Sequence, residues 1–377
     1  MKSKKKVLSK PMIIFLVIIS IILFVIWLFL HAPNLSKATV SKNTIDNGYN
    51  NRVTNHVDSL VQKDNKLYYK YTGNSGFNCG VYEISSLGSK RILVDTNIGS
   101  ITEALFYPEA DDFFEYDDKI IIKPKYGNRD SLYTINSFFC TKSWYRDLKP
   151  IDGNEVYNVD VYNNELYCFA EKSVYKYSNG KYEKKAEFPQ DLKGDRNFIE
   201  AGQDYYFYSD KIYFPLKNGE TYDIYSVSLS DNKCVKICST PIKADIYNFV
   251  IEGNYALIGV WTIPSPTDDY EEVNLYRVNL NSAKTEVLMN DACSFNCFNN
   301  KLYVYGDGLY IVDIESKATE KIYNGDVGAA FIFDEDWIYF TDNYNCLYRI
   351  SINNKEVETI VPMSSLQENV LRKYNAL

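Results

Sequence analysis

Apolar and polar residues alternate along most of this chain in short segments bounded by Asn, Asp or Gly. In seven places a polar turn runs directly into β-branched and aromatic residues, opening at positions 67, 120, 166, 212, 255, 302 and 338. The intervals are 53, 46, 46, 43, 47 and 36 residues. Asn, Asp and Gly tolerate the left-handed backbone of tight hairpin turns. The pattern therefore predicts repeated β-hairpins with a period near 45 residues.

A second motif follows each of these segments: an apolar residue, Tyr, any residue and another apolar residue. Its tyrosines are Tyr82, Tyr133, Tyr175, Tyr225, Tyr276, Tyr310 and Tyr348. With the strands that precede and follow, each unit has four strands, which is typical of a propeller blade. We predict an all-β fold, a seven-bladed β-propeller over residues 53–362. Six or eight blades are also compatible, because units two and three are the least regular.

Tyrosine is unusually frequent, at 34 of 377 residues, and suits half-buried strand positions. Tyr68, Tyr213, Tyr303 and Tyr339 recur in the strand after the polar turn. We interpret this stripe as packing between blades rather than as a carbohydrate platform. A binding site is normally an exception to a repeat, whereas the stripe is part of it.

The N-terminal segment differs from the rest of the chain. Five lysines precede an apolar run at 12–30 in which Ser20 is the one polar residue. A helix of 19 residues is about 28 Å long and matches a bilayer core of about 30 Å. The lysines predict a cytoplasmic segment 1–11, a single-pass signal-anchor helix at 12–30 and a propeller outside the cell membrane. A cleaved secretory signal ending near Ala38 is the alternative.

Two further segments complete the predicted organisation, a polar linker at 31–52 and a C-terminal tail at 363–377. Without the basic N-terminal segment, 36 Lys and Arg stand against 49 Asp and Glu, a formal net charge of −13. Binding of nucleic acid depends on neutralising phosphates. An acidic propeller is therefore not expected to have a nucleic-acid partner.

Eight cysteines are spread along the chain, and two pairs are spaced four residues apart. On a strand such a spacing separates the Cα atoms by about 13 Å, too far for a disulfide within a pair. Bonds between pairs stay open, as does a role as small apolar residues. Neither pair has the two-residue spacing of a zinc knuckle. The cysteines are Cys79, Cys140, Cys168, Cys234, Cys238, Cys293, Cys297 and Cys346.

One known family resembles the repeat. The segment Trp337-Ile338-Tyr339-Phe340-Thr341-Asp342, followed by Leu347-Tyr348-Arg349-Ile350, is similar to the Tyr-Trp-Thr-Asp repeat of low-density lipoprotein receptor propellers. It looks closer still to a bacterial group of membrane-anchored, receptor-related propeller domains. The similarity covers roughly residues 60–362, and only the last unit approaches the full motif. The resemblance implies a propeller fold and leaves function open, because this fold hosts many functions.

Histidine is too rare for common catalytic chemistry. The chain has only His31 and His56, both before the repeats. This argues against Ser-His-Asp or Cys-His catalysis and against histidine-bound metals. No glycine-rich phosphate loop is recognisable. The sequence therefore predicts no catalytic residues, no metal and no cofactor, although calcium could contact acidic loops.

Two acidic loops are the nearest approach to a site. One covers 109–115 and the other covers 264–272, after Trp261, in the longest link of its kind. Links between blades and links from second to third strands emerge on the same face of a propeller, and such loops carry binding residues on rigid scaffolds. Plain solvated loops are the alternative. The candidate binding residues are Asp111, Asp112, Trp261, Asp268, Asp269, Glu271 and Glu272.

The sequence therefore favours a non-catalytic, membrane-anchored binding module that recognises a protein or a cell-wall glycan through its loop-rich face. The enzymatic alternative is a carboxylate-dependent glycan hydrolase or lyase, which needs two carboxylates about 5–10 Å apart. A structural role within an envelope complex is the third interpretation.

Overall fold

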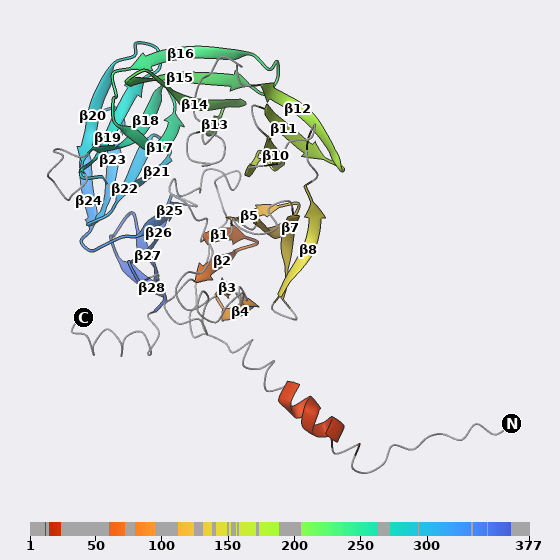
Figure 1. Ribbon diagram of the computed structural model, residues 1–377. Helices are drawn as coiled ribbons and strands as arrows, with labels where there is room; N and C mark the ends of the chain where they lie inside the picture. Colours follow the sequence, from red (N-terminus) through yellow and green to blue (C-terminus); the bar gives the residue numbers. More distant parts are fainter. Residues whose placement is uncertain are drawn as a thin grey trace.

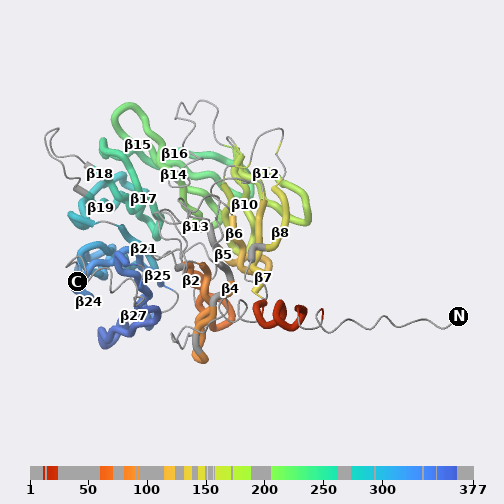
Figure 2. Tube along the Cα trace, turned by 60° about the horizontal axis from the view of Figure 1, so that its bottom comes forward, coloured from red at the N-terminus to blue at the C-terminus, as the bar shows by residue number. Residues whose placement is uncertain are grey.

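The computed structural model describes residues 12, 15–23, 60–71, 80–94, 112–123, 131–137, 141–148, 151, 156, 158–170, 173–187, 205–262, 272–292, 294–332, 335–344 and 346–362. The strands among these residues form seven four-stranded antiparallel sheets. The sheets stand as blades around a common centre (Figure 1). Figure 2, turned by 60°, shows the chain running once around the ring from orange to blue. The predicted all-β propeller with seven blades is confirmed.

Each blade uses four consecutive strands, with the first nearest the centre. Blades one and two comprise β1 (Leu60–Lys63), β2 (Lys66–Tyr71), β3 (Gly80–Ser85), β4 (Gly88–Val94), β5 (Asp112–Tyr116), β6 (Lys119–Lys123), β7 (Ser131–Asn136) and β8 (Thr141–Asp147). Blades three and four comprise β9 (Asn158–Tyr162), β10 (Glu165–Ala170), β11 (Ser173–Ser178), β12 (Lys181–Glu187), β13 (Tyr206–Tyr208), β14 (Lys211–Asn218), β15 (Thr221–Ser228) and β16 (Cys234–Thr240). Blades five and six comprise β17 (Asp245–Glu252), β18 (Tyr255–Thr262), β19 (Glu272–Asn279), β20 (Thr285–Asn290), β21 (Ser294–Phe298), β22 (Lys301–Tyr305), β23 (Leu309–Asp313) and β24 (Thr319–Tyr323). Blade seven comprises β25 (Ala329–Ile332), β26 (Trp337–Thr341), β27 (Leu347–Ser351) and β28 (Val357–Val361).

The polar pairs identified in the sequence are the turns between first and second strands. Five of these turns have positive φ at both residues, as a two-residue hairpin of the primed type requires. In blade five Gly253 supplies the positive φ, of 56°. The cross-strand register makes Ala256, not Tyr255, the equivalent of Leu67, one residue later than the spacing assumed. The five turns are Asp64-Asn65, Asp117-Asp118, Asn163-Asn164, Ser209-Asp210 and Asn299-Asn300.

The tyrosine motif also has a structural role that recurs in every blade. In all seven pairings between third and fourth strands the register shifts immediately before the motif tyrosine. Such a β-bulge places two residues opposite one and increases the local twist. Tyr225 and Tyr348 then stack on the second-strand rings of Phe214 and Phe340, with centroids 5.6 Å and 5.3 Å apart. The motif therefore marks the site where each blade twists.

The ring closes by packing of side chains. One buried cluster combines Leu60 and Tyr69 of blade one with Tyr303 of blade six and Phe331 and Ile338 of blade seven. Figure 1 shows β25–β28 beside β1–β4 accordingly. Among the described residues no strand is exchanged between the first and last blades, because every sheet consists of consecutive strands. Closure therefore depends on the apolar area buried at this seam.

The tyrosine stripe lies inside the packed regions. All four of its members are buried, and three core clusters share them. Tyr68, for example, packs in one cluster with Ile120 and Ile122 of the neighbouring blade two. The interpretation of the stripe as packing between blades is confirmed.

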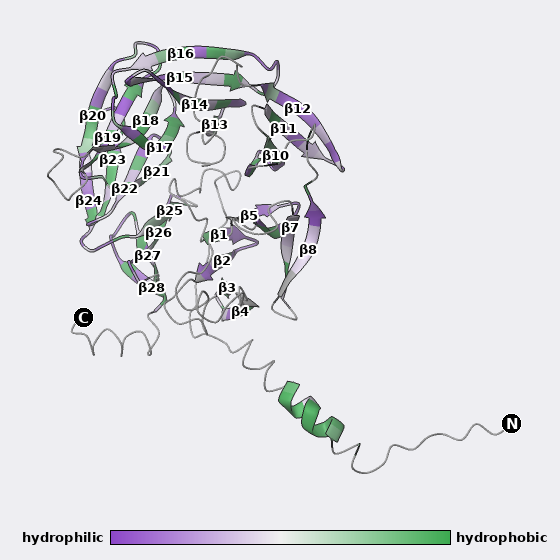
Figure 3. Cartoon of the chain, viewed as in Figure 1, coloured by the Kyte–Doolittle hydropathy of each residue, from purple (hydrophilic) through white to green (hydrophobic). Residues whose placement is uncertain are grey.

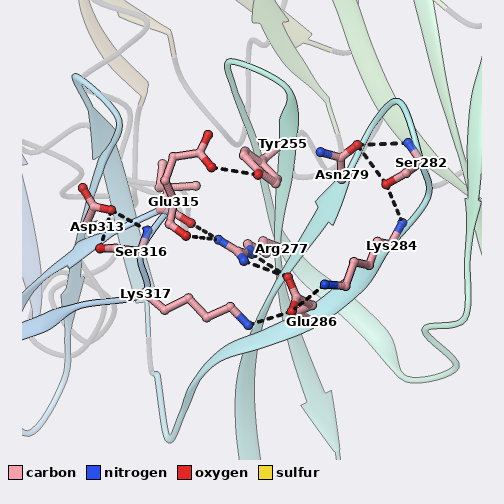
Figure 4. Close-up of polar contacts among 11 residues, drawn as sticks. Tyr255, Arg277, Asn279, Ser282, Lys284, Glu286, Asp313, Glu315, Ser316 and Lys317 are labelled. Carbon is pink, nitrogen blue, oxygen red and sulfur yellow. Dashed lines mark hydrogen bonds and ion pairs between the residues drawn. The ribbon is translucent and has the colours of Figure 1, made fainter.

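A network of charged residues joins blades five and six (Figure 4). Arg277 of β19 lies opposite Glu286 of β20, with Nη2 2.7 Å from Oε2. Its guanidinium lies over the Tyr255 ring, 5.3 Å from the centroid. Arg277 also donates to the carbonyls of Ile314 and Glu315 in the β23–β24 turn, the second at 2.9 Å. The arginine thus fixes the turn of one blade against the outer strands of another.

A lysine in the same turn adds a second link, and the next interface repeats it. Lys317 donates to Glu286 Oε1 at 2.9 Å, and Lys355 of blade seven lies 3.0 Å from Glu320 of blade six. Both lysines have a φ of 62°. The sequence spacing does not indicate that Lys317 pairs with Glu286 or that Lys355 pairs with Glu320.

The Glu286 carboxyl should make stability depend on pH. Hydrogen bonds from Lys317, Arg277 and Lys284 lower its pKa from 4.5 to about 2. A carboxyl whose pKa is lower in the folded than in the unfolded state stabilises the fold at pH values above the unfolded-state pKa. For Glu286 this contribution is lost as the pH falls from 4.5 through about 2. In urea titrations, the difference in unfolding midpoint between the natural protein and Glu286→Gln should shrink across this window. A difference that stays constant from pH 6 to pH 2.5 would contradict the assignment.

The N-terminal segment contributes a short exposed helix outside the ring. Met12 and residues 15–23 are helical, and the helix is mostly green on the hydropathy scale of Figure 3, unlike the mixed strands β8 and β12. Within the part of the chain that the structure describes, no helix has the length and apolar character needed to cross a bilayer. The rest of the predicted 12–30 span lies outside the described residues.

Five cysteines are described, and all five carry free thiols. Burial raises the pKa of Cys168 to about 12 and also raises that of Cys238, which keeps both thiols protonated at neutral pH. Cys79, Cys140 and Cys293 lie outside the described residues. No group of three or more His, Cys, Asp or Glu suited to a metal occurs among the residues that are described.

Candidate functional site

Most of the candidate binding residues lie outside the described part of the chain. Asp111, Asp268, Asp269 and Glu271 are not described, and residues 112–115 of the predicted loop 109–115 belong instead to strand β5. The structure gives only backbone positions for the other two acids, Asp112 at the start of β5 and Glu272 at the start of β19. Trp261 is the one member of the set whose side chain is described. The site is therefore built from Trp261 outward.

Trp261 lies in the part of the ring where the strands are longest. Strands β14, β15, β17, β18 and β19 of blades four and five have 8 residues each, whereas the remaining strands have 3 to 7. The extra length carries the ends of β14 and β18 further out on the face where second strands lead into third strands. Trp261, next to last in β18, is 48% exposed there.

A second bulge, found in blade five, orients the ring beneath Trp261. Of the seven pairings between first and second strands that the structure describes, only β17–β18 shifts register, leaving Tyr247 as the extra residue. Bulges next to functional sites redirect side chains. The Tyr247 ring stacks on the Trp261 indole with centroids 5.4 Å apart and planes 22° apart. Its hydroxyl donates to the Ala292 carbonyl at 2.7 Å, which fixes the ring.

Gly259 is the residue that makes room for this ring. A Cβ at position 259 would lie 2.6 Å from Tyr247 Cζ and 2.8 Å from Cε1, closer than van der Waals contact allows. Tyr247 therefore lies directly on the backbone of β18. The Tyr247 ring, which supports the Trp261 indole, is therefore held in one position by the bulge, by Gly259 and by its own hydroxyl group.

Gly259→Ala should displace Tyr247 and weaken the stack. Overpacking of this kind costs about 1–3 kcal/mol in the free energy of unfolding. Urea titration would measure the cost, and tryptophan emission would report greater solvent exposure of Trp261. In a Tyr247→Ala background the added methyl group has no ring to displace, so the same substitution should cost less. Equal costs in both backgrounds would show that the close approach is unimportant.

Polar side chains from blades four and five meet at the cross-strand neighbour of Trp261. Asp245 is the cross-strand partner of Trp261, and such partners have Cβ atoms about 5 Å apart. Lys217, next to last in β14, donates to Asp245 Oδ1 at 2.9 Å, and the Tyr222 hydroxyl donates to the same oxygen at 3.3 Å. The Lys217 ammonium lowers the pKa of Asp245, which keeps the carboxylate charged at neutral pH. We call Lys217, Tyr222, Asp245, Tyr247 and Trp261 the Trp261 patch.

Sequence reasoning found one of these five residues. The sequence points to Trp261 because this residue precedes the longest connection between a second and a third strand. The sequence does show Gly259 interrupting an apolar strand, which often marks a close backbone approach. This signal, read with the aromatic residue before it in β17, could have indicated the Tyr247 support.

Trp144 gives a useful contrast. It is 63% exposed on the outer strand β8, and its indole nitrogen donates to Asp147 at 2.8 Å. Exposure alone therefore does not distinguish Trp261 from Trp144. The stacked ring of Tyr247 beneath Trp261 does. Trp144 is the natural control for experiments on the patch.

The aspartate of the receptor-like motif serves its own loop. Asp342 Oδ1 accepts the backbone N–H groups of Tyr344 and Cys346, each at 2.9 Å. Its Oδ2 accepts the Tyr348 hydroxyl at 3.1 Å. The side chain therefore shapes the loop between β26 and β27.

No protein-family model and no curated protein matches the chain. Among solved structures, a nidogen/laminin complex matches with 12% identity and a TM-score of 0.37, over 66% of this chain and 92% of that chain. The extracellular domain of a hybrid two-component system from B. thetaiotaomicron matches with 13% identity and a TM-score of 0.42, over 68% and 33%. A puromycin-hydrolysing peptidase from Mycobacterium tuberculosis matches with 10% identity and a TM-score of 0.46, over 88% and 57%. This chain spans less than two thirds of the last two proteins, and none of the three assigns it a function.

Proposed function

We propose that this chain is a non-catalytic binding module, held at the cell membrane by residues 12–30, that contacts a partner through the Trp261 patch. The observation that carries the proposal is the departure of this patch from the repeat. Every other blade pairs its first and second strands without a bulge in the described residues. In blade five the bulge at Tyr247 supports the exposed ring of Trp261. Exposed aromatic residues on a rigid support are typical anchors of binding surfaces.

Capture from isolated cell envelopes tests the role of the patch. The full-length chain would be crosslinked to envelopes of the source organism, and the captured material compared between Trp261→Ala and Trp144→Ala. We expect Trp261→Ala to lose specific capture and Trp144→Ala to retain it. Equal capture by both variants would reject the patch as the contact surface.

Membrane attachment is tested separately. We expect the chain to stay with membranes after an alkaline carbonate wash and its propeller to be digested by protease added to intact cells lacking an outer barrier. Release by carbonate, or protection from the protease, would contradict the proposed anchor or its orientation. A carboxylate-dependent hydrolase, the enzymatic alternative, has no observation in its favour among the described residues.

A further inference from the structure

The Trp261 patch has the chemistry of a saccharide subsite. We infer that the exposed indole stacks under a neutral pyranose ring while Asp245 and Lys217 bind the hydroxyl groups of that ring. This inference rests on the proposed function and names the ligand class for the same surface.

The stacked pair provides a flat and rigid platform. Tyr247 lies along the indole, with planes 22° apart, and about half of the Trp261 side chain stays exposed. The C–H groups on one face of a pyranose carry partial positive charge, and the face of an aromatic ring is negative. The two surfaces therefore attract each other when they lie parallel. Because Gly259 and the Tyr247 anchor already fix the platform, little ordering is needed on binding.

The adjoining polar groups match hydroxyls, which both donate and accept hydrogen bonds. Lys217 and the Tyr222 hydroxyl both contact Asp245 Oδ1, and the Asp245 side chain is 80% exposed. A carboxylate has about four lone-pair sites, so the exposed Asp245 can accept further hydrogen bonds from a ligand. An acceptor and a donor 2.9 Å apart can hold two neighbouring hydroxyls of one ring.

The same charges disfavour other ligand classes. An apolar peptide would strip water from the Lys217–Asp245 pair and from the nearby Lys243–Glu220 pair, at 2.8 Å, without replacing its hydrogen bonds. Each pair is internally neutral, and the whole chain carries a formal charge of −8, so no field attracts an anionic polymer. A neutral, hydroxyl-rich ligand avoids both penalties.

Binding to defined oligosaccharides tests the inference. The full-length chain would be screened against neutral hexose and N-acetylhexosamine oligosaccharides, and the best ligand titrated by calorimetry. We expect Trp261→Ala to weaken binding by about tenfold or more, as for a central aromatic anchor. Trp261→Phe should lose less, Asp245→Ala should weaken binding severalfold, and Trp144→Ala should bind like the natural protein.

Fluorescence gives a second readout that is independent of affinity. In a Trp144→Phe background the ligand should shift tryptophan emission to shorter wavelength, because the sugar excludes water from Trp261. No such shift should occur when Trp261 is also changed to Phe. A shift that persists there would place the ligand elsewhere and overturn the inference.

Failure of the inference and failure of the proposed function give different results. If no neutral oligosaccharide binds, but Trp261→Ala still loses envelope capture, the ligand class is wrong and the binding surface stands. If Trp261→Ala retains both saccharide binding and envelope capture, both proposals are overturned.

Discussion

Phe331→Ala should destabilise the propeller by about 3–5 kcal/mol, the usual range for a fully buried phenylalanine. Phe331 lies on the innermost strand of blade seven and has no exposed surface. It belongs to the cluster that joins blades six, seven and one. Its removal leaves a cavity at the seam, where the described strands of blades one and seven are not exchanged. Urea unfolding followed by circular dichroism would measure the loss.

Val357→Ala is the matched control for this experiment. Val357 lies on β28, the outer strand of the same blade, and is 40% exposed. Its truncation should change the free energy of unfolding by no more than about 0.5 kcal/mol. Comparable losses for the two variants would mean that the seam is not the main support of closure.

Arg277→Met should lower the free energy of unfolding by about 2–3 kcal/mol. The guanidinium is nearly buried between blades five and six and bonds two carbonyls of the β23–β24 turn as well as Glu286 (Figure 4). Methionine preserves part of the packing, so the loss reflects hydrogen bonds to a charged group and partners left buried. Thermal and urea unfolding of the full-length chain would give the difference.

Lys284→Met separates this effect from simple removal of charge. Lys284 also lies 3.2 Å from Glu286, but its side chain is exposed. Exposed ion pairs contribute about 0–1 kcal/mol, so this variant should remain near the natural stability. If Lys284→Met destabilised the protein as much as Arg277→Met, net charge rather than the inter-blade contact would be responsible.

The fold could be predicted from the sequence because its strongest signals are local. A turn such as Asn299-Asn300 needs positive φ at two consecutive residues, and few residue types tolerate that conformation. Five turns have this conformation, and the polar turns at similar spacing in all seven units indicate about seven blades. The motif tyrosines strengthened the prediction, although their coincidence with bulges required the structure.

The site was less predictable because its determinants are not periodic. A bulge at Tyr247 is one additional residue in a strand, and alternation of apolar and polar residues hardly changes. Lys217 and Asp245 belong to different blades and meet only because β14 and β17 are neighbours in the ring. Trp261 was accessible to sequence reasoning since it adjoins an unusually long connection. The acidic residues of that connection stay a prediction.

Because each blade is a single uninterrupted stretch of the polypeptide, the gene can be cut and rejoined at blade boundaries. Duplication of one period would add a complete structural unit, and joining the last blade to the first would allow new termini to open between any two units. Rings of other sizes could therefore arise by evolution or be engineered by adding or removing whole blades. A single blade with a specialised surface could be moved without changes to the sequence of its neighbours.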